Sequence, residues 1–248
     1  MTELSRAERF LTEYASLEDH LRRTLNRDQG YPYKRLVEDM RKKGLVTDSQ
    51  VQALYTFGYL RNALAHAVES GGEVIADPRQ SAVDEFIALA EMVKAPPFLV
   101  NVVRHRVESL GIDEPLSAFT LLVKTRDFSQ APVLEQGRFV DMLTLGRLAR
   151  WIADNRHYDK FDLFDTPIRS VLEVPLQAEE FFAVCDPDIN LAQALNLFDF
   201  GGVVANEEPV VPVRGLLVLK VGQEVDDLQA LVTFEDLPLM LRALGRGA

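Results

Sequence analysis

Three polar side chains on one predicted helix are the residues best suited to chemistry on a phosphodiester. Arg61, Asn62 and His66 stand close together in a run that is otherwise apolar. A guanidinium can hold a phosphate in two-point contact, and an imidazole can move a proton near neutral pH. Asn62 and His66 are four residues apart and share a helix face, and the long side chain of Arg61 can reach the same ligand. Arg61 and His66 also fit a structural role, in which one caps the helix and the other forms a salt bridge.

Positive charge is concentrated in one segment of an acidic chain. The formal net charge of −11 at pH 7 argues against a broad surface that binds nucleic acid. Between Arg22 and Lys43, however, eight basic residues stand against three acidic ones. This segment predicts a local positive face, which is either a solvated helix surface or a surface that binds RNA.

The sequence carries no signature of a metal site or of nucleophilic catalysis. Its single cysteine, Cys185, cannot form an internal disulfide, and His, Cys and Asp residues do not cluster at the spacing of metal ligands. It has neither a phosphate-binding glycine loop nor a nucleophile elbow. We therefore expect no metal and no cofactor, and a reducing compartment.

Four helices with short connections are predicted to position the Arg61 group. Local signals mark where these helices begin and end. Capping boxes at Ser5–Glu8 and Thr47–Gln50 start two of them, Gly44 ends a helix over about 33–43, and Asp77–Pro78 starts the last. Ala95-Pro96-Pro97 then marks a domain boundary. The pattern predicts a four-helix bundle over residues 1–95.

This bundle resembles the HEPN superfamily, whose hallmark is an arginine followed after four to six residues by a histidine. Arg61 and His66 match that spacing, and a glycine-bearing loop, Ile75 and a final helix follow. The resemblance implies that Arg61 and His66 are the catalytic pair of a metal-independent endoribonuclease, supported by Asn62, with single-stranded RNA as partner. Non-catalytic members imply the alternative, a bundle that serves dimerisation or partner binding.

The remainder of the chain contains two weakly similar copies of one unit. Residues 113–119 parallel 188–194 at an offset of 75 (188 minus 113), and residues 139–148 parallel 228–237 at an offset of 89 (228 minus 139). Both copies read strand, helix, strand, strand, helix. The predicted strands are Arg106–Leu110, Phe128–Leu134 and Arg138–Thr144 in the first copy, and Glu180–Cys185, Pro212–Lys220 and Leu228–Thr233 in the second.

That βαββα plan resembles the CBS (cystathionine-β-synthase-type) domain, with Ser129-Gln130-Ala131-Pro132-Val133-Leu134 on the middle strand and Thr-x-x-Asp after the last. The resemblance implies a pseudo-twofold pair that binds AMP, ADP, ATP, S-adenosylmethionine or a cyclic dinucleotide as a regulatory ligand. Its ribose-binding motif is complete in the second copy, as Thr233 and Asp236. In the first copy Thr144 is kept, but Arg147 replaces the acid. We expect Arg147 to meet either a phosphate or a surface carboxylate.

The rest of the predicted nucleotide site comes from the strands and from a basic cluster. Strands that begin at Phe128 and Val213 can supply an apolar slot and backbone hydrogen bonds for an adenine, with Ser129 and Gln130 beside it. Arg106, in the run Arg104-His105-Arg106, is a candidate for the phosphates. The alternative is that this run decorates a linker helix.

Together these patterns predict an α+β protein, an N-terminal α-helical bundle followed by a tandem βαββα CBS-type pair. We expect the pair at residues 96–248, with repeats at about 98–155 and 162–248. Apolar residues make up 47% of the chain, yet no apolar run approaches the ~20 residues needed to cross a bilayer. We therefore expect a soluble, cytoplasmic adenine-nucleotide sensor that does not bind membranes. Both resemblances favour a homodimer or a dimer of dimers.

Overall fold

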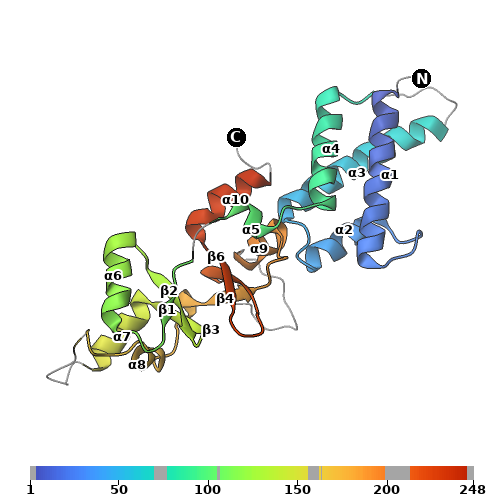
Figure 1. The fold of residues 1–248 in the computed structure, drawn as a ribbon. Coiled ribbons are helices and arrows are strands. Elements are labelled where there is room, and N and C mark those ends of the chain that lie inside the picture. The colour runs from blue at the N-terminus through green and yellow to red at the C-terminus, as the bar shows by residue number, and fades with distance from the viewer. Residues whose placement is uncertain are drawn as a thin grey trace. The chain divides into compact units, whose positions relative to one another are not determined.

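The computed structural model describes residues 4–69, 77–104, 107–155, 162, 164–198 and 213–244. The chain divides into two compact units, whose elements are labelled in Figure 1. The helical unit comprises Met1–Phe98, Asn190–Val210 and Met240–Ala248, and the sheet unit comprises Leu99–Ile189 and Val211–Leu239. No helix in the described part of the chain is long and apolar enough to span a membrane.

The first helix of the bundle, α1 (Arg6–Leu25), begins with the predicted capping box. The Ser5 hydroxyl accepts a hydrogen bond from the Glu8 amide (3.2 Å), and the Glu8 carboxylate accepts one from the Ser5 amide (2.8 Å). This reciprocal pair satisfies amide groups that a helix start otherwise leaves without a partner. Asn26 ends the helix at a φ of 52°, in the left-handed region that asparagine tolerates better than most residues.

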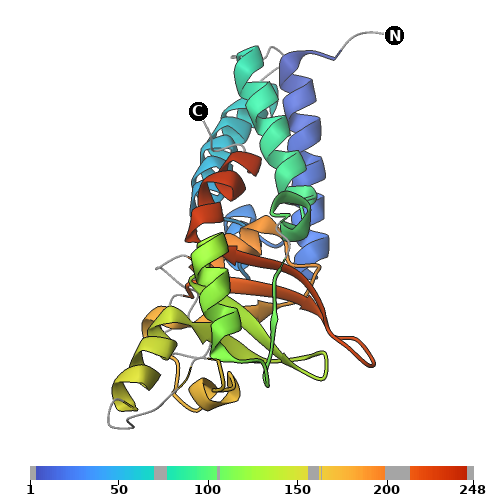
Figure 2. The same cartoon turned by 60° about the vertical axis from the view of Figure 1, so that its left-hand side comes forward.

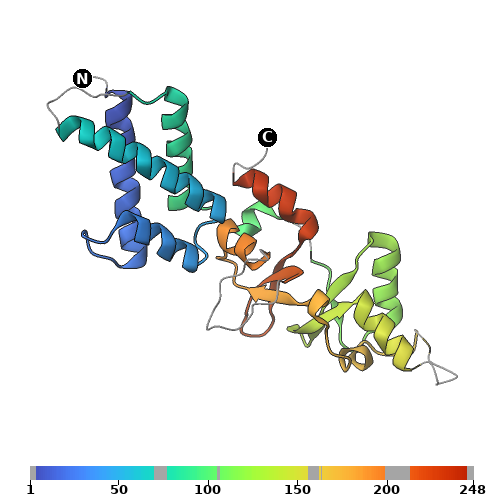
Figure 3. The same cartoon turned by 180° about the vertical axis from the view of Figure 1, so that it is seen from behind.

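Three further helices complete the bundle: α2 (Tyr33–Lys42), α3 (Asp48–Glu69) and α4 (Gln80–Lys94). Figure 3 shows α3 crossing α1 and α4. The second capping box is confirmed, because the Gln50 side chain accepts from the Thr47 amide at 2.9 Å. The predicted start of α4 at Pro78 is wrong. The carboxylate of Asp77 pairs with Arg6 instead of capping, and the helix begins at Gln80.

Aromatic rings fill the core between these helices. The ring centroid of Phe86 lies 4.7 Å from that of Phe10 and 5.0 Å from that of Phe57. Gly58 on α3 faces Tyr14 and Tyr33, whose atoms would be in ordinary van der Waals contact with a β-carbon there, at 3.4–3.5 Å. Each buried ring stabilises the fold by about 1.5–3 kcal/mol, so the bundle holds α3 in a fixed orientation.

Two small sheets with the same plan form the centre of the sheet unit. Their strands are β1 (Leu110–Gly111), β2 (Gln130–Glu135) and β3 (Arg138–Thr144), then β4 (Phe182–Cys185), β5 (Gly215–Lys220) and β6 (Asp227–Thr233). In each sheet the first pair of strands is parallel and the second pair is antiparallel. Figure 2 shows the tips of both hairpins on the same side.

Helices follow the strands in the same order along the chain in the two copies. The helices from Leu99 onward are α5 (Leu99–Val102), α6 (Leu116–Arg126), α7 (Leu145–Asp154), α8 (Arg169–Leu172), α9 (Leu191–Phe198) and α10 (Leu237–Ala243). In the first copy α6 follows β1 and α7 follows β3; in the second, α9 follows β4 and α10 comes after β6. A helical bundle followed by two small mixed sheets confirms the predicted α+β fold class.

Strand register confirms both predicted offsets. Leu110 of β1 and Cys185 of β4 each lie opposite the fourth residue of the next strand, an offset of 75 (185 minus 110). Thr144 and Thr233 each lie opposite the first residue of β2 or β5, an offset of 89 (233 minus 144). The turn after Lys220 has four more residues than the turn after β2. The second hairpin therefore accounts for part of the difference between the two offsets, 75 and 89.

The leading strand of the first copy is shorter than predicted, and Pro132 explains why. Strand β1 begins at Leu110, not at Arg106, whose own placement lies outside the described residues. The Leu134 carbonyl accepts from Ile112 (2.8 Å) and so faces the β1 side. Pro132, two residues earlier, faces the same side and has no amide hydrogen to continue the ladder. The second copy has Leu217 at this place, and β4 is four residues long.

Hydrogen bonds and an ion pair join the tips of the two hairpins. Arg138 at the start of β3 donates to the Gly222 carbonyl (2.6 Å) and pairs with Asp226 (3.0 Å). The other Asp226 oxygen accepts from the Phe139 amide (2.9 Å). These contacts, which we call the clasp, use the longer turn of the second hairpin. Gly137 at the opposing tip has a φ of +79° and leaves no room for a β-carbon beside Val225.

Residues 164–180, which we call the connector, complete the first copy. Ile168 and Val171 are fully buried in the same core as Leu110 and Phe119. The Leu116 amide donates to the Thr166 carbonyl at 2.9 Å, so the connector also holds the start of α6. The first copy therefore takes part of its structure from the chain that follows α7.

Candidate ligand-binding cleft

A cleft of about 680 Å³ lies in the sheet unit, at the ends of β3 and β6. Thr144 and Thr233, the final residues of these strands, both line it. Ser129 and Gln130 line it from the start of β2. Because strand register places the two threonines equivalently, the repeat brings matching parts of both copies to one cavity. Its size lies within the usual range for small-molecule sites, about 300–1,000 Å³.

The second copy presents a hydroxyl and a carboxylate that fix each other. The Asp236 carboxylate accepts from the Thr233 amide at 2.9 Å, and the Thr233 hydroxyl accepts in return from the Asp236 amide. Only 8% of Asp236 is exposed. Both residues line the cleft, so the predicted Thr-x-x-Asp pair lies on its wall.

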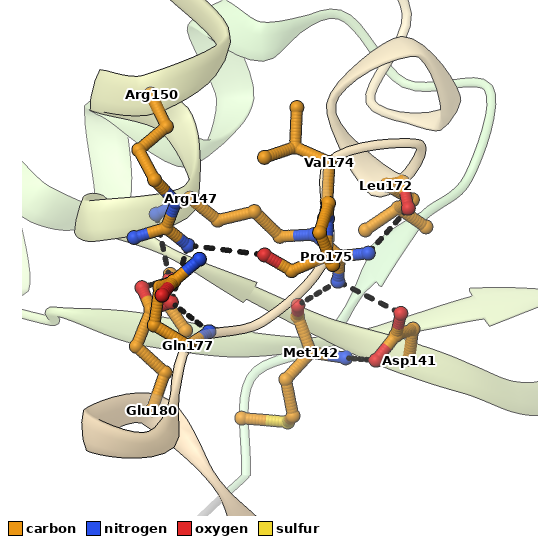
Figure 4. A network of polar contacts seen from close by, with 10 residues as sticks. Asp141, Met142, Arg147, Arg150, Leu172, Val174, Pro175, Gln177 and Glu180 are labelled. Carbon is orange, nitrogen blue, oxygen red and sulfur yellow. Dashed lines mark hydrogen bonds and ion pairs between the residues drawn. The ribbon is translucent and has the colours of Figure 1, made fainter.

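In the first copy, the carboxylate beside the threonine comes from the connector. The Thr144 hydroxyl caps α7 by accepting from the Arg147 amide (3.0 Å), and it donates to Glu180. Glu180 ends the 3₁₀ helix η1 (Ala178–Glu180). Its other oxygen accepts from Arg150 and from the Gln177 amide (2.9 Å). Figure 4 shows Arg150 and Gln177 converging on Glu180.

Hydrogen bonds hold Glu180 in its ionised form. Burial alone would raise the pKa of its carboxyl group. The amide of Gln177, the hydroxyl of Thr144 and the guanidinium of Arg150 outweigh burial, so the pKa lies below its ordinary value. The cleft wall therefore carries a carboxylate at neutral pH beside Thr144.

Arg147 points away from the cleft and does not line it. Its guanidinium donates to the Asp141 carboxylate (2.7 Å) and to the Met142 carbonyl (2.8 Å), and it also reaches the carbonyls of Leu172 and Val174 in the connector. Only 3% of the side chain is exposed. Figure 4 shows these acceptors surrounding it. We expected Arg147 to meet either a phosphate or a surface carboxylate. In the structure it pairs with the carboxylate of Asp141, but inside the fold, and it also donates to backbone carbonyls.

The other predicted nucleotide residues divide into those at the cleft and those elsewhere. Ser129 and Gln130 are at the cleft, and the Gln130 amide nitrogen lies close to Gly215, 3.4 Å from the position of a β-carbon there. Val213 does not line the cleft, but Arg214 does. Arg106 and its neighbour His105 lie outside the described residues.

The cleft wall combines apolar side chains with carboxylates. Phe128, Leu145, Leu231 and Phe234 contribute apolar surface, and the Arg214 guanidinium lies over the Phe234 ring at 5.3 Å. Its carboxylates are Glu108, Asp127, Glu179, Glu180, Glu235 and Asp236. Arg214 is the one cation among the described lining residues, so of these residues it alone offers a phosphate a counter-charge.

The side chains predicted for phosphodiester chemistry belong to the helical unit. Arg61 and Asn62 are exposed on α3, and Arg61 donates to Asn62 at 3.4 Å. The backbone of His66 lies in the same helix, but its side chain is outside the described residues. Within the described chain, no group of three or more His, Cys, Asp or Glu side chains is placed to hold a metal ion.

Sequence reasoning missed Glu180, Arg150 and Arg214 as residues of the cleft or its support. Gln177-x-x-Glu180 does carry a local signal, because its ends form a capping box around η1. That signal predicts a helix start but says nothing about Thr144, which is 36 residues away in the chain.

No protein-family model matches the sequence, and no curated protein matches it significantly. Solved structures that contain CBS domains are similar to it. The CBS domain of the bacterial CNNM/CorC family Mg²⁺ transporter is 15% identical over 77% of this chain and 96% of that one, with a TM-score of 0.41. The same domain in complex with ATP is 13% identical over 66% and 96%, with a TM-score of 0.39. CbpB in complex with c-di-AMP is 15% identical over 60% and 86%, with a TM-score of 0.41.

Proposed function

We propose that residues 96–248 are a CBS-type pair that binds an adenine nucleotide as a regulatory ligand, and that residues 1–95 carry the response. One observation supports this most. Two hairpins of equal register end in Thr144 and Thr233 at a single cleft, and Thr233 is joined there by Asp236. A duplicated βαββα unit with this motif at the strand end is the feature that resembles the CBS pair.

The wall offers a partner to each part of a nucleotide. Ribose hydroxyls donate to the Asp236 carboxylate, which the Thr233 amide already holds in place. A purine packs on the apolar side chains of Phe128 and Leu231. Arg214 binds a phosphate. Because Thr233 and Asp236 are ordered by each other, binding costs little side-chain entropy at this point.

Calorimetric titration of the full-length protein with AMP, ATP and c-di-AMP tests the proposal. We expect Asp236→Asn to weaken binding about 10- to 100-fold, because the lost bonds are those of a charged acceptor. The matched control is Asp227→Asn, at the other end of β6, which should bind as the wild type does. Equal affinity in the wild type and Asp236→Asn, or no binding of any of the three, would contradict the proposed site.

For the helical bundle we propose metal-independent cleavage of single-stranded RNA, gated by the nucleotide. The exposure of Arg61 and Asn62 on α3 favours this, since an RNA phosphate can reach both. In this mechanism the RNA 2′-hydroxyl attacks the adjacent phosphate and the bond from phosphorus to the 5′-oxygen breaks, which leaves a 2′,3′-cyclic phosphate and a 5′-hydroxyl. His66 moves the proton from the 2′-hydroxyl to the leaving 5′-oxygen, and Arg61 stabilises charge on the phosphate oxygens. The alternative is a non-catalytic bundle that dimerises or binds a partner.

Cleavage of single-stranded RNA in EDTA, with and without AMP or ATP, separates these alternatives. Arg61→Ala and His66→Ala should each lower the rate, and His66→Ala about 10²–10⁴-fold. Arg9→Ala, an exposed arginine on α1, is the control. An inert wild type would favour the non-catalytic bundle. Light scattering checks the expected homodimer or dimer of dimers, and a monomer at micromolar concentration would count against catalysis.

A further inference from the structure

The two copies hold their carboxylates by different routes. In the second copy the acid stands three residues after Thr233, as Asp236. In the first copy that place is Arg147, and its side chain is committed to Asp141 and to carbonyls away from the cleft. Thr144 nevertheless has a carboxylate beside it, because its hydroxyl donates to Glu180.

We propose that Glu180 is the acid of a second hydroxyl-binding pair in the cleft, replacing the one that Arg147 displaced. This inference rests on the proposed nucleotide function and assigns a ligand hydroxyl to Thr144 and Glu180. The ligand class is a ribose with its 2′-hydroxyl present. Both residues line the same cleft as Thr233 and Asp236.

Gly146 shows that the first copy is shaped to admit this side chain. A β-carbon at Gly146 would overlap the Glu180 carboxylate. The equivalent residue of the second copy, two positions after Thr233, is Glu235, which is exposed. The first copy therefore lacks the acid at one position and has a glycine at its neighbour, which is the space that a carboxylate from the connector needs.

The carboxylate also keeps capacity for a ligand. An ionised carboxylate has about four lone-pair sites. One Glu180 oxygen accepts from Arg150 and from Gln177, whereas the other accepts from Thr144. A site therefore remains on the oxygen beside Thr144. Because Arg150 and Gln177 hold the side chain, a ribose hydroxyl meets an acceptor that is already oriented.

A structural role for Glu180 makes a different prediction about ligand selectivity. If it only ties the connector to α7, its loss weakens AMP and 2′-deoxy-AMP equally, through the stability of the fold. If it accepts from the 2′-hydroxyl, its loss weakens AMP alone. The ratio of the two dissociation constants therefore separates binding from support.

Calorimetry of the full-length protein with AMP and 2′-deoxy-AMP measures this ratio in four proteins. They are the wild type, Glu180→Gln, Asp236→Asn and the double variant. We expect each single variant to keep part of the preference for AMP, and the double variant to lose a further 10- to 100-fold of it. Glu173→Gln removes an exposed connector carboxylate and serves as the control.

Thr144→Val tests the same pair from its other member, since it leaves the contact of Glu180 with Arg150 and should reduce the preference for AMP as Glu180→Gln does. If the double variant matches Asp236→Asn in both dissociation constants, Glu180 does not bind the ligand and the inference fails while the nucleotide function stands. If the wild type binds no adenine nucleotide, the proposed function fails and this inference fails with it.

Discussion

Replacing Arg147 with methionine tests whether this arginine is part of the fold or part of the ligand site. The guanidinium is 3% exposed and has four acceptors, three of them backbone carbonyls. Methionine keeps much of the volume but leaves these oxygens without their donor. Breaking a buried, hydrogen-bonded ion pair costs about 3–5 kcal/mol. Because 31% of Asp141 is exposed and can be rehydrated, we expect the lower half of that range.

Urea unfolding followed by tryptophan fluorescence measures the loss of stability in the first copy, where Arg147 lies. The chain has one tryptophan, and Trp151 lies in α7, in the core of the first copy. Arg169→Met is the control, since its pair with Asp113 is half exposed and such pairs contribute about 0–1 kcal/mol. A loss below about 1 kcal/mol in Arg147→Met, together with weaker nucleotide binding, would refute the structural role and favour a phosphate contact.

Three further perturbations test the cleft and the clasp. Folding lowers the pKa of Glu180, so its contribution to stability is present above the ordinary pKa of a glutamate, about 4.3, and is lost as the pH falls through the lower folded-state pKa. The wild type's advantage over Glu180→Gln in urea midpoint should therefore shrink as the pH is lowered below about 4.3, and an unchanged advantage would contradict this contribution. Asp226→Asn weakens the clasp and should speed hydrogen exchange at the Phe139 amide, measured by mass spectrometry; unchanged exchange would contradict the clasp. Gly137→Ala, at a φ of +79° and against Val225, should cost about 1–3 kcal/mol in urea unfolding, and a neutral result would show that the turn can move.

The repeat could be predicted from sequence because its signals are local. Strand patterns and the threonines at the strand ends lie within a few residues of what they specify. Register then follows, since a strand with one buried face cannot slip by one residue. The length of β1 is harder to predict from sequence, because it depends on which side Pro132 faces in the neighbouring strand β2.

The cleft chemistry of the first copy could be predicted only in part. Sequence shows that Arg147 replaces an acid, but not that its guanidinium is turned into the fold. It shows Glu180 in a capping box, but not that Glu180, 36 residues after Thr144 in the chain, lies beside that threonine in the fold. Such pairings depend on the path of the connector, which short-range patterns do not encode. The Arg61 group remains a prediction from spacing, with Arg61 and Asn62 placed on the exposed face of α3.

The connector also decides whether the first copy can be made without the chain that follows it. The first copy takes core side chains from Ile168 and Val171, and the partner of its Thr144 from Glu180. On a ribosome, these residues emerge only after α7 has been synthesised. The first copy therefore cannot complete its fold until the connector has been made. A fragment that ends at residue 155 would lack all three groups. The halves are therefore not interchangeable: exchanging their order or expressing the first one alone would separate it from residues that complete it.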